Sequence, residues 1–222
     1  VVFSPVKVDQ NDIEQFLNVE MNYSKKIAQD AVNNGKLLGW VLMQNTNVGP
    51  DDYNFMWVNA YPTIEIAANE NAWWSHSEKV VGIKPDVLFS DSSKYKYDRS
   101  YTYKMQMSIP NTGPAAYVIL NFATPDDVNA VAASSKKYVI PHFKKNMSDN
   151  GMVGWGMATK ITPQGQEYSS MMTYDSYDSL KNAMKHLAGE GIIEGLPMDK
   201  LTKVTWEMRP IMKVISSTTE KE

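Results

Sequence analysis

One phrase of this sequence occurs twice, and the repeat limits what the chain can fold into. The residues NNGKLLGW stand at 33–40, and SDNGMVGW stands at 148–155. Both contain an Asn-Gly pair, two adjacent apolar residues and a final Gly-Trp. The closing residues, Trp40 and Trp155, are each followed by a tyrosine 13 positions later. The repeat predicts that the chain is a tandem duplication in which each half has the same plan.

The order of predicted elements supports this interpretation. Hydrophobic periodicity and turn residues predict strand, helix, two strands, helix and strand in each half. The strands expected in the first half are 1–8, 36–44, 53–61 and 94–108, and its helices are 13–32 and 62–74. The strands expected in the second half are 115–123, 152–161, 167–176 and 201–215, and its helices are 124–150 and 176–187.

Four residues mark the ends and the interior of the long helices. Gly35 and Gly151 each follow one of them, where a left-handed residue commonly ends a helix. Thr124 precedes a proline and two aspartates, which predicts a helix that begins there with Thr124 as its cap. Pro141 lacks an amide hydrogen, so we expect a kink or a break at that point.

The order β-α-β-β-α-β is the plan of a ferredoxin-like module. The helices of such a module cover one face of its sheet, so the other face needs a partner. The predicted fold is therefore α+β, with two tandem ferredoxin-like modules packed as a pseudo-dimeric α/β barrel. The modules are expected at residues 1–110 and 114–215. The segment 216–222 has no apolar residue and is expected to be a disordered tail.

At this point the sequence resembles the dimeric α/β-barrel superfamily in its fused, tandem form. The resemblance rests on the doubled element order, on NGKLLGW and NGMVGW, and on YNFMWVNAYPTIE at 53–65. The chain is similar to bacterial relatives of the NIPSNAP and antibiotic-biosynthesis-monooxygenase groups. That superfamily includes cofactor-free monooxygenases, isomerases and haem-binding enzymes. The resemblance carries no catalytic motif that can be placed on a residue of this chain.

Composition and charge exclude several classes of function. The chain has no cysteine, which excludes disulfides, thiolate metal sites and a cysteine nucleophile. Its net charge is −3 and no basic run exceeds a lysine pair, so no nucleic-acid partner is expected. No apolar run approaches the ~18 residues of a membrane span, and no histidine pair has metal-ligand spacing. The first residue is not methionine, which favours a periplasmic or secreted protein, after removal of a signal peptide, over a cytoplasmic one.

Alternation along the predicted strands indicates where a small molecule would bind. Trp57, Asn59 and Tyr61 share one face of 53–61, and this face combines aromatic surface with a polar amide, as ligand pockets do. An ordinary core with hydrogen-bonded polar groups explains the same row. The candidate ligand-binding residues are these three, their counterparts Tyr168, Met172 and Tyr174, and the glycine-flanked Trp40 and Trp155.

Among the three histidines, His142 is the candidate catalytic residue. It follows Pro141, where a kink would free backbone carbonyl groups. The resemblance allows His142 to be a base or the ligand of a haem, although the cofactor stays unknown from the sequence. A hydrogen-bonded helical histidine without a catalytic role is the alternative.

Three functions remain open at this stage. The first is a small-molecule-binding protein of the dimeric α/β-barrel type, whose pocket is rich in aromatic residues and methionine. The chain has 14 methionines, and methionine side chains adapt well to varied ligands. The second is a monooxygenase- or isomerase-like enzyme, with or without haem. The third is a structural or interaction module whose barrel is filled. They differ in whether the space between sheet and helices is empty, occupied by a bound molecule or packed with side chains.

Overall fold

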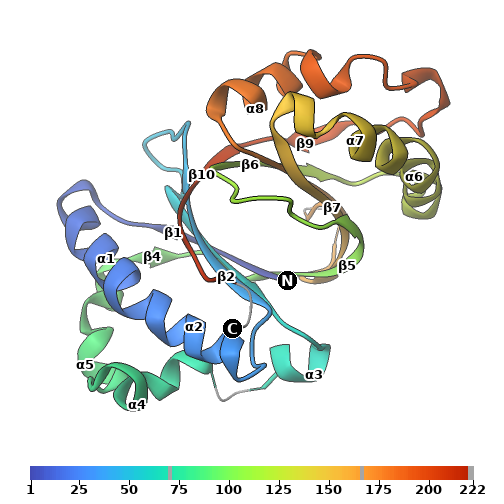
Figure 1. Cartoon of the computed structure of the whole chain (residues 1–222). Coiled ribbons are helices and arrows are strands. Elements are labelled where there is room, and N and C mark those ends of the chain that lie inside the picture. Colours follow the sequence, from blue (N-terminus) through green and yellow to red (C-terminus); the bar gives the residue numbers. More distant parts are fainter. Residues whose placement is uncertain (70–71, 166–167, 220–222) are drawn as a thin grey trace. The chain divides into compact units, whose positions relative to one another are not determined.

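The computed structural model describes residues 1–69, 72–165 and 168–219 (Figure 1). The chain is a mixed α+β protein and divides into two compact units. Unit 1 comprises residues 1–100 and the chain from Val214 onward, and unit 2 comprises Tyr101–Lys213. Among the described residues, no helix is both long enough and apolar enough to cross a bilayer.

Unit 1 begins with a strand and a long helix, as the sequence predicts. Its elements are β1 (Val2–Lys7), α1 (Ile13–Val19), a π-helical turn (Glu20–Ser24), α2 (Lys25–Asn33), β2 (Gly39–Asn45), β3 (Phe55–Ala60), α3 (Ile64–Ala67), α4 (Ser77–Val81), α5 (Pro85–Leu88) and β4 (Lys96–Tyr97). Short 3-10 turns lie at Gln10–Asp12, Trp73–His76 and Ser90–Lys94.

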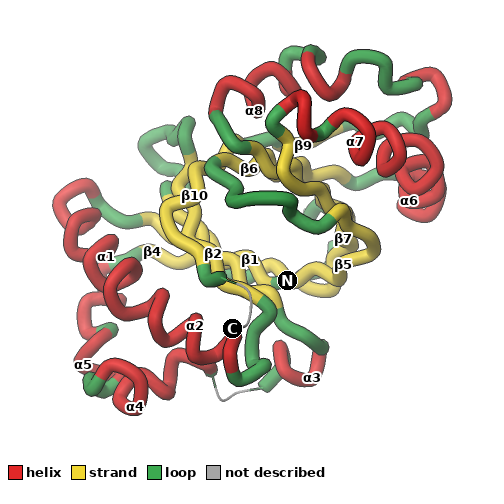
Figure 2. The backbone as a smooth tube through the Cα atoms, viewed as in Figure 1, coloured by secondary structure: helices red, strands yellow, loops and turns green. Residues whose placement is uncertain are grey.

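The strands of unit 1 form an antiparallel sheet in the order β4-β1-β3-β2. The register places Trp40 opposite Asn59 and Ser4 opposite Trp57. The helices of the unit lie along one face of this sheet (Figures 1 and 2). The core between sheet and helices includes Phe16, Ile27, Ala31, Leu37, Trp40, Leu42 and Phe55, each no more than 2% exposed.

Unit 2 has a second set of strands and helices. Its elements are β5 (Tyr101–Ile109), β6 (Tyr117–Ala123), α6 (Val128–Ser134), a π-helical turn (Ser135–Val139), α7 (Ile140–Asn146), β7 (Met152–Thr162), β8 (Met171–Tyr177), α8 (Leu180–Leu187) and β9 (Trp206–Met208). Strand β10 (Ile211–Ser217) begins in unit 2 and ends in unit 1. Short 3-10 turns lie at Ser148–Asn150, Gly191–Ile193 and Met198–Lys200.

The sheet of unit 2 is also antiparallel and runs in the order β5-β7-β8-β6-β9. Residues Ile211–Lys213 of β10 pair with β6. The register places Trp155 opposite Asp175 and Asn121 opposite Thr173. The core of this unit includes Ile119, Ala123, Met152, Met157, Met171, Tyr177 and Ala183, each no more than 1% exposed.

A π-helical turn interrupts the long first helix of each unit. The turns start at Glu20 and at Ser135, which are 115 positions apart. The same offset separates Trp40 from Trp155. Pro141 lies at the start of α7, directly after the second turn. The first turn has no proline near it, so proline alone does not explain a feature that both helices share.

The structure differs from the sequence-based expectations at several boundaries. Helix α6 begins at Val128 rather than at Thr124, because the side chain of Asp127 accepts the hydrogen bond from the amide of Ala130. The strand expected at 94–108 is divided into β4 and β5.

The tail expected from residue 216 is ordered over its first part. Strand β10 includes Ser216 and Ser217. The amide of Thr218 donates to the carbonyl of Trp40 at 3.0 Å, and the amide of Thr219 donates to Gln29 at 2.9 Å. The polar composition of this segment suggested disorder, but its backbone forms hydrogen bonds with β2 that do not depend on apolar side chains. The last three residues expected in the tail, 220–222, lie outside the described residues.

Candidate functional site

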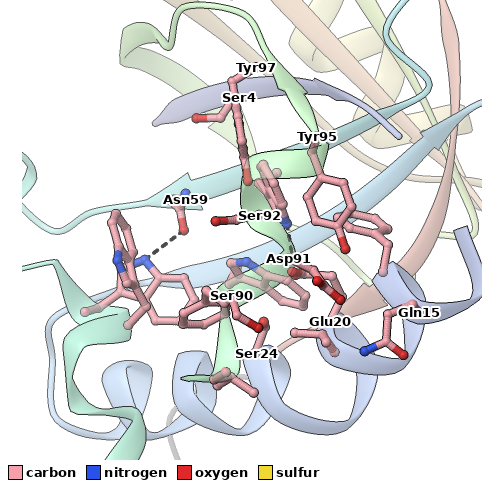
Figure 3. Close-up of a pocket in the computed structure, with 18 of the residues that line it drawn as sticks. Ser4, Gln15, Glu20, Ser24, Asn59, Ser90, Asp91, Ser92, Tyr95 and Tyr97 are labelled. Atoms are coloured by element: carbon pink, nitrogen blue, oxygen red, sulfur yellow. Dashed lines mark hydrogen bonds between the residues drawn. The ribbon is translucent and has the colours of Figure 1, made fainter. Parts of the chain in front are cut away.

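Unit 1 contains a cavity of about 410 Å³ between its sheet, its long helix and the segment 85–100 (Figure 3). Glu20 and Ser24 extend into it from the helix side, and Asn59 and Tyr97 lie across from them. The wall consists of aromatic, hydroxyl and carboxyl side chains, with few aliphatic ones. The lining residues used below are Ser4, Phe16, Glu20, Ser24, Trp40, Trp57, Asn59, Trp73, Trp74, Asp91, Tyr95, Tyr97 and Asp98.

Aromatic rings form a continuous part of this wall. The rings of Phe16 and Trp57 lie 5.7 Å apart, centroid to centroid. Trp57 stacks on Tyr97 with centroids 5.7 Å apart and planes inclined by 18°. Phe16 also meets Tyr95 edge-on at 5.3 Å. Such a wall offers flat, polarisable surface to a ligand that is itself planar and apolar.

Glu20 is the buried acid of the cavity. Its residue is 6% exposed, and one carboxylate oxygen accepts a hydrogen bond from Nε1 of Trp57 at 2.9 Å. Burial raises the pKa of Glu20 from 4.5 to about 7, while the hydrogen bond from Trp57 opposes this rise. A carboxyl group with this pKa can give or take a proton near neutral pH, which general acid–base catalysis requires.

Ser24, one helical turn after Glu20, is a buried hydroxyl without a partner. The residue is 3% exposed, and among the described residues its Oγ has no hydrogen bond. The hydroxyl lies close enough to Glu20 to lower the pKa of that acid, but not in hydrogen-bond geometry. Buried hydroxyl groups are usually paired, so Ser24 presents an unused donor and acceptor to the cavity.

Asn59 adds an amide to the same wall. Its Oδ1 accepts a hydrogen bond from Nε1 of Trp73 at 3.1 Å, which fixes the orientation of the side chain. The amide NH₂ therefore points away from that indole and is a hydrogen-bond donor for a ligand. Two tryptophans thus orient the two main polar groups of the cavity, since Trp57 holds Glu20 and Trp73 holds Asn59.

The charged groups of the lining are all acidic. Three carboxyl groups, those of Glu20, Asp91 and Asp98, line the cavity, and no described lining residue is Lys, Arg or His. Asp91 has a basic neighbour outside the lining, because Nζ of Lys94 lies 2.9 Å from its carboxylate. Burial, with help from Asp91, raises the pKa of Tyr95 to about 12, so that hydroxyl stays protonated at neutral pH.

The structure brings some of the sequence-predicted residues together and separates others. Trp40, Trp57 and Asn59 line the cavity. Tyr61 packs against the core of unit 1 and is not among the lining residues. The remaining candidates belong to unit 2 and lie outside this cavity.

The unit 2 candidates have separate surroundings. Trp155 packs edge-on against Phe143 in the core, with centroids 6.2 Å apart. Met172 is fully buried. Tyr174 covers Gly156, where an added Cβ would come within 2.3 Å of the tyrosine ring. Tyr168 lies against the ammonium group of a lysine, Lys160, at 5.3 Å.

The histidines do not reach the cavity of unit 1. Nε2 of His142 lies 2.8 Å from the carbonyl oxygen of Ile192, as expected for a hydrogen-bonded helical histidine. His186 is buried against the hydroxyl of Tyr177, and His76 lies 2.6 Å from Nζ of Lys36. The described residues that line this cavity therefore include no histidine that could be the ligand of a haem. Among the described residues, no group of three His, Asp or Glu side chains is arranged to hold a metal ion.

Strand register identifies the unit 2 residues that correspond to the cavity wall. Asn59 pairs with Trp40, and Asp175 pairs in the same way with Trp155. Asp175 is 2% exposed and accepts a hydrogen bond from Asn121. Asn121 also donates to Thr173 at 3.0 Å and accepts from Nε of Arg209 at 2.7 Å. In unit 2 a hydrogen-bonded polar network thus occupies the corresponding positions.

Sequence reasoning missed the two residues that give the cavity its polar character. Glu20 and Ser24 lie on the apolar side of the long helix, four residues apart and in line with Phe16. A charged residue within an apolar stripe of helical period is the signal that could have found them. The π-helical turn that they share was not visible in the sequence, and such turns are frequent at functional sites.

No protein-family model matches the chain, and no curated protein sequence matches it significantly. Solved structures do match its fold. A protein of Lactobacillus acidophilus, provisionally assigned as a monooxygenase, aligns with a TM-score of 0.64 and 11% identity, over 99% of this chain and 95% of its own. An anthrone oxidase-like protein aligns with a TM-score of 0.55 and 12% identity, over 100% and 93%.

A chlorite dismutase variant from Candidatus Nitrospira defluvii, in complex with cyanide, aligns with a TM-score of 0.57 and 8% identity, over 97% of this chain and 90% of its own. The chain therefore has the mixed α+β fold of the dimeric α/β-barrel proteins, which confirms that part of the sequence-based prediction. At identities this low the likeness concerns the fold, and the site has to be judged on its own residues.

Proposed function

We propose that the cavity of unit 1 binds a small, largely aromatic molecule and that Glu20 removes a proton from it as a general base. The observation that carries this proposal is the buried carboxyl group of Glu20, with a pKa of about 7, inside an aromatic cavity of about 410 Å³. Perturbed acids in clefts are typical of active sites. The protein would then be an enzyme of the monooxygenase or isomerase type.

Each lining group has a role in this reaction. The aromatic wall holds the planar body of the substrate and excludes water. Trp57 orients the carboxylate of Glu20 through its indole N–H, so that the free oxygen faces the acidic C–H or O–H of the substrate. The amide of Asn59, fixed by Trp73, can donate to a carbonyl oxygen as negative charge develops on it.

The chemistry after proton removal depends on the substrate. In an isomerisation, Glu20 returns the proton to another carbon of the same molecule. In an oxidation, the carbanion reacts with O₂ to give a peroxide anion. This anion takes up the proton from Glu20 to become a hydroperoxide, which then loses water to leave a ketone. For anthrone this sequence consumes one O₂ and yields anthraquinone and one H₂O. The likeness of the fold to an anthrone oxidase-like protein supports the choice of anthrone as a first probe.

We also propose that the two units derive from tandem ferredoxin-like modules at residues 1–110 and 114–215. The equal spacing of the π-helical turns and of Trp40 and Trp155 supports this origin. On this proposal the first module has kept an open cavity, whereas Asn121 and Asp175 have filled the corresponding position of the second.

Proton removal can be tested separately from oxidation. Anthrone is incubated with the protein in deuterated buffer at pH 7.5 under argon, and loss of its methylene signal is followed by ¹H NMR. O₂ uptake is then measured in air. We expect the protein to accelerate both, and Glu20→Gln to reduce both by about 10²-fold, as for loss of a general base.

Glu14→Gln is the matched control, because it makes the same change at an exposed position of the same helix. It should leave both rates unchanged. Equal rates for the wild-type protein and Glu20→Gln would contradict the proposed role. A protein that binds anthrone without accelerating either reaction would be a small-molecule-binding protein, which is the second candidate. The unused hydroxyl of Ser24 favours that candidate, because binding by itself accounts for such a group.

A further inference from the structure

We infer that the cavity of unit 1 selects an organic cation, namely a protonated amine or a quaternary ammonium group carried on a planar apolar body. This inference deepens the proposed function, since it rests on the same cavity and names the class of molecule that the cavity takes. It follows from the sign of the charges in the lining, from the aromatic wall and from the unpartnered Ser24.

The lining can neutralise a positive ligand but not a negative one. Glu20, Asp91 and Asp98 supply three carboxyl groups, and the described lining residues include no basic side chain. Asp91 and Asp98 have basic neighbours, with Lys94 at 2.9 Å and Arg99 at 3.7 Å. The neighbours of Glu20 among the described residues are neutral: the indole of Trp57, the hydroxyl of Ser24 and the phenols of Tyr95 and Tyr97. Of the three carboxyl groups, that of Glu20 is therefore the one that most lacks a positively charged neighbour.

The aromatic wall favours the same sign of charge. The face of an aromatic ring carries partial negative charge, so it attracts a cation within ~6 Å of the ring, and more strongly where the cation is desolvated. Phe16, Trp57 and Tyr97 form an unbroken series of rings beside Glu20, with neighbouring centroids 5.7 Å apart. An ammonium group placed between these rings and the carboxylate would interact favourably with both.

Ser24 is the observation that points to a ligand independently of charge. A buried hydroxyl without a partner costs free energy that a bound donor or acceptor would recover, and this one lies in the cavity wall beside Glu20. Its oxygen can accept a hydrogen bond from an N–H donor. A primary ammonium group has three such donors, which suits the joint presence of a carboxylate and a free hydroxyl.

Ligand binding would then be linked to the proton on Glu20. A cation stabilises the ionised carboxylate, so it lowers the pKa of Glu20, which is about 7 without ligand. Affinity for the cation should therefore rise as the pH increases from 6 to 8. The other titratable groups of the lining are the carboxyl groups of Asp91 and Asp98 and the phenols of Tyr95 and Tyr97. Burial raises the pKa values of the two phenols. Those phenols do not titrate in this range.

Three naphthalene derivatives of matched shape test the inference by calorimetry: 2-naphthylmethylammonium, 2-naphthylmethanol and 2-naphthoate. At pH 7.5 we expect the ammonium compound to bind at least tenfold more tightly than the alcohol, and the carboxylate to bind more weakly than either. Glu20→Gln should weaken binding of the ammonium compound at least tenfold and change that of the alcohol less than twofold. Glu14→Gln should change neither.

A pH series on the wild-type protein gives a readout that needs no variant, because affinity for the ammonium compound should rise at least threefold between pH 6 and pH 8 while affinity for the alcohol stays level. Equal binding of ammonium compound and alcohol, or tightest binding of the carboxylate, would overturn the inference and leave the proposed site intact. Failure of all three to bind would overturn both the inference and the site. Acceleration of anthrone exchange together with equal binding of the three probes would overturn the charge selection alone.

Discussion

The carboxyl group of Glu20 is 6% exposed and faces aromatic rings, and burial raises its pKa to about 7. The described residues that line its cavity include no basic side chain that would oppose this rise. The sign of the resulting pH dependence follows from the pKa of Glu20, which is 4.5 ordinarily and about 7 in the folded chain. Between these values the folded state binds more protons than the unfolded state. The free energy of unfolding should therefore decrease as the pH rises from 4.5 through 7.

The first prediction concerns this dependence. Ionisation of buried Glu20 should cost the wild-type protein up to about 3 kcal/mol of unfolding free energy between pH 4.5 and pH 8. The side chain introduced in Glu20→Gln cannot ionise. The unfolding free energy of this variant should therefore lack the decrease that ionisation of Glu20 causes in the wild type over the same pH range. Urea unfolding curves at both pH values measure the difference, with Glu14→Gln as the control that follows the wild type. Parallel curves for the wild type and Glu20→Gln would show that Glu20 is not buried as described.

The second prediction concerns the indole that holds this acid. Trp57→Phe keeps an aromatic ring but removes the Nε1 donor, which lies 2.9 Å from Glu20 and lowers its pKa. The pKa of Glu20 should rise above 7, since a hydrogen bond to the charged form is lost. Titration of the ¹³C-labelled carboxyl group by NMR measures this. Trp74→Phe, at the exposed edge of the cavity, should leave the pKa where it is, and an equal shift in both variants would refute the role of Trp57.

At the residue scale the sequence pointed to three residues that line the cavity. Strand alternation places Trp57 and Asn59 on one face, and the repeated Gly-Trp pair drew attention to Trp40. Glu20 and Ser24 could not be, because their importance depends on which space the helix faces. Tyr61 shares the parity of Asn59, yet it lies beyond the end of β3, where alternation no longer fixes its direction.

Helix ends show what local sequence can specify at the scale of an element. Gly35 and Gly151 have left-handed φ angles of 71° and 62°, as predicted from their positions after the long helices. The start of α6 was harder to place, because Thr124, Asp126 and Asp127 are all residues that favour a cap. The choice among them depends on where the chain leaves β6, which neighbouring strands determine.

The third prediction tests that choice. Asp127→Ala removes the carboxylate that accepts a hydrogen bond from the amide of Ala130 at 2.9 Å. The loss of a cap typically costs about 1 kcal/mol of unfolding free energy. Asp126→Ala removes the same charge one position earlier, where no cap hydrogen bond is made, and should cost clearly less. Thermal or urea unfolding of the two variants gives the comparison. A larger loss for Asp126→Ala than for Asp127→Ala would contradict Asp127 as the cap of α6.

At the scale of the whole molecule, the sequence predicted a mixed α+β chain but did not predict how the strands are distributed between the two units. Residues 101–109 were expected to close the first module, but they group with unit 2 because β5 pairs with β7. Strand pairing between segments far apart in sequence leaves no local signal. The same limit affected the choice of candidate pocket residues in unit 2. Alignment of Tyr168 with Tyr53 made Met172 and Tyr174 the counterparts of Trp57 and Asn59. Register instead makes Thr173 and Asp175 the counterparts of Trp57 and Asn59.

The fourth prediction follows from this difference between the units. The cavity with its buried acid is in unit 1, whereas the corresponding positions of unit 2 are joined by hydrogen bonds among Asn121, Thr173 and Asp175. One chain should therefore bind one molecule of a planar ligand. Native mass spectrometry of the protein with 2-naphthylmethylammonium should show a single added mass, which Glu20→Gln reduces and Asp175→Asn leaves in place.

An absorption spectrum from 250 to 700 nm on the same sample tests the cofactor as well. Because the histidines lie outside the cavity, with His142 bonded to the carbonyl of Ile192, we expect no Soret band from the purified protein. A Soret band lost in His142→Ala would instead make that histidine a haem ligand and unit 2 the working half. Two added ligand masses per chain would show that both units bind. A single mass that persists in Glu20→Gln but disappears in Asp175→Asn would move the site to unit 2, because the acid required for binding would then be the one paired with Trp155.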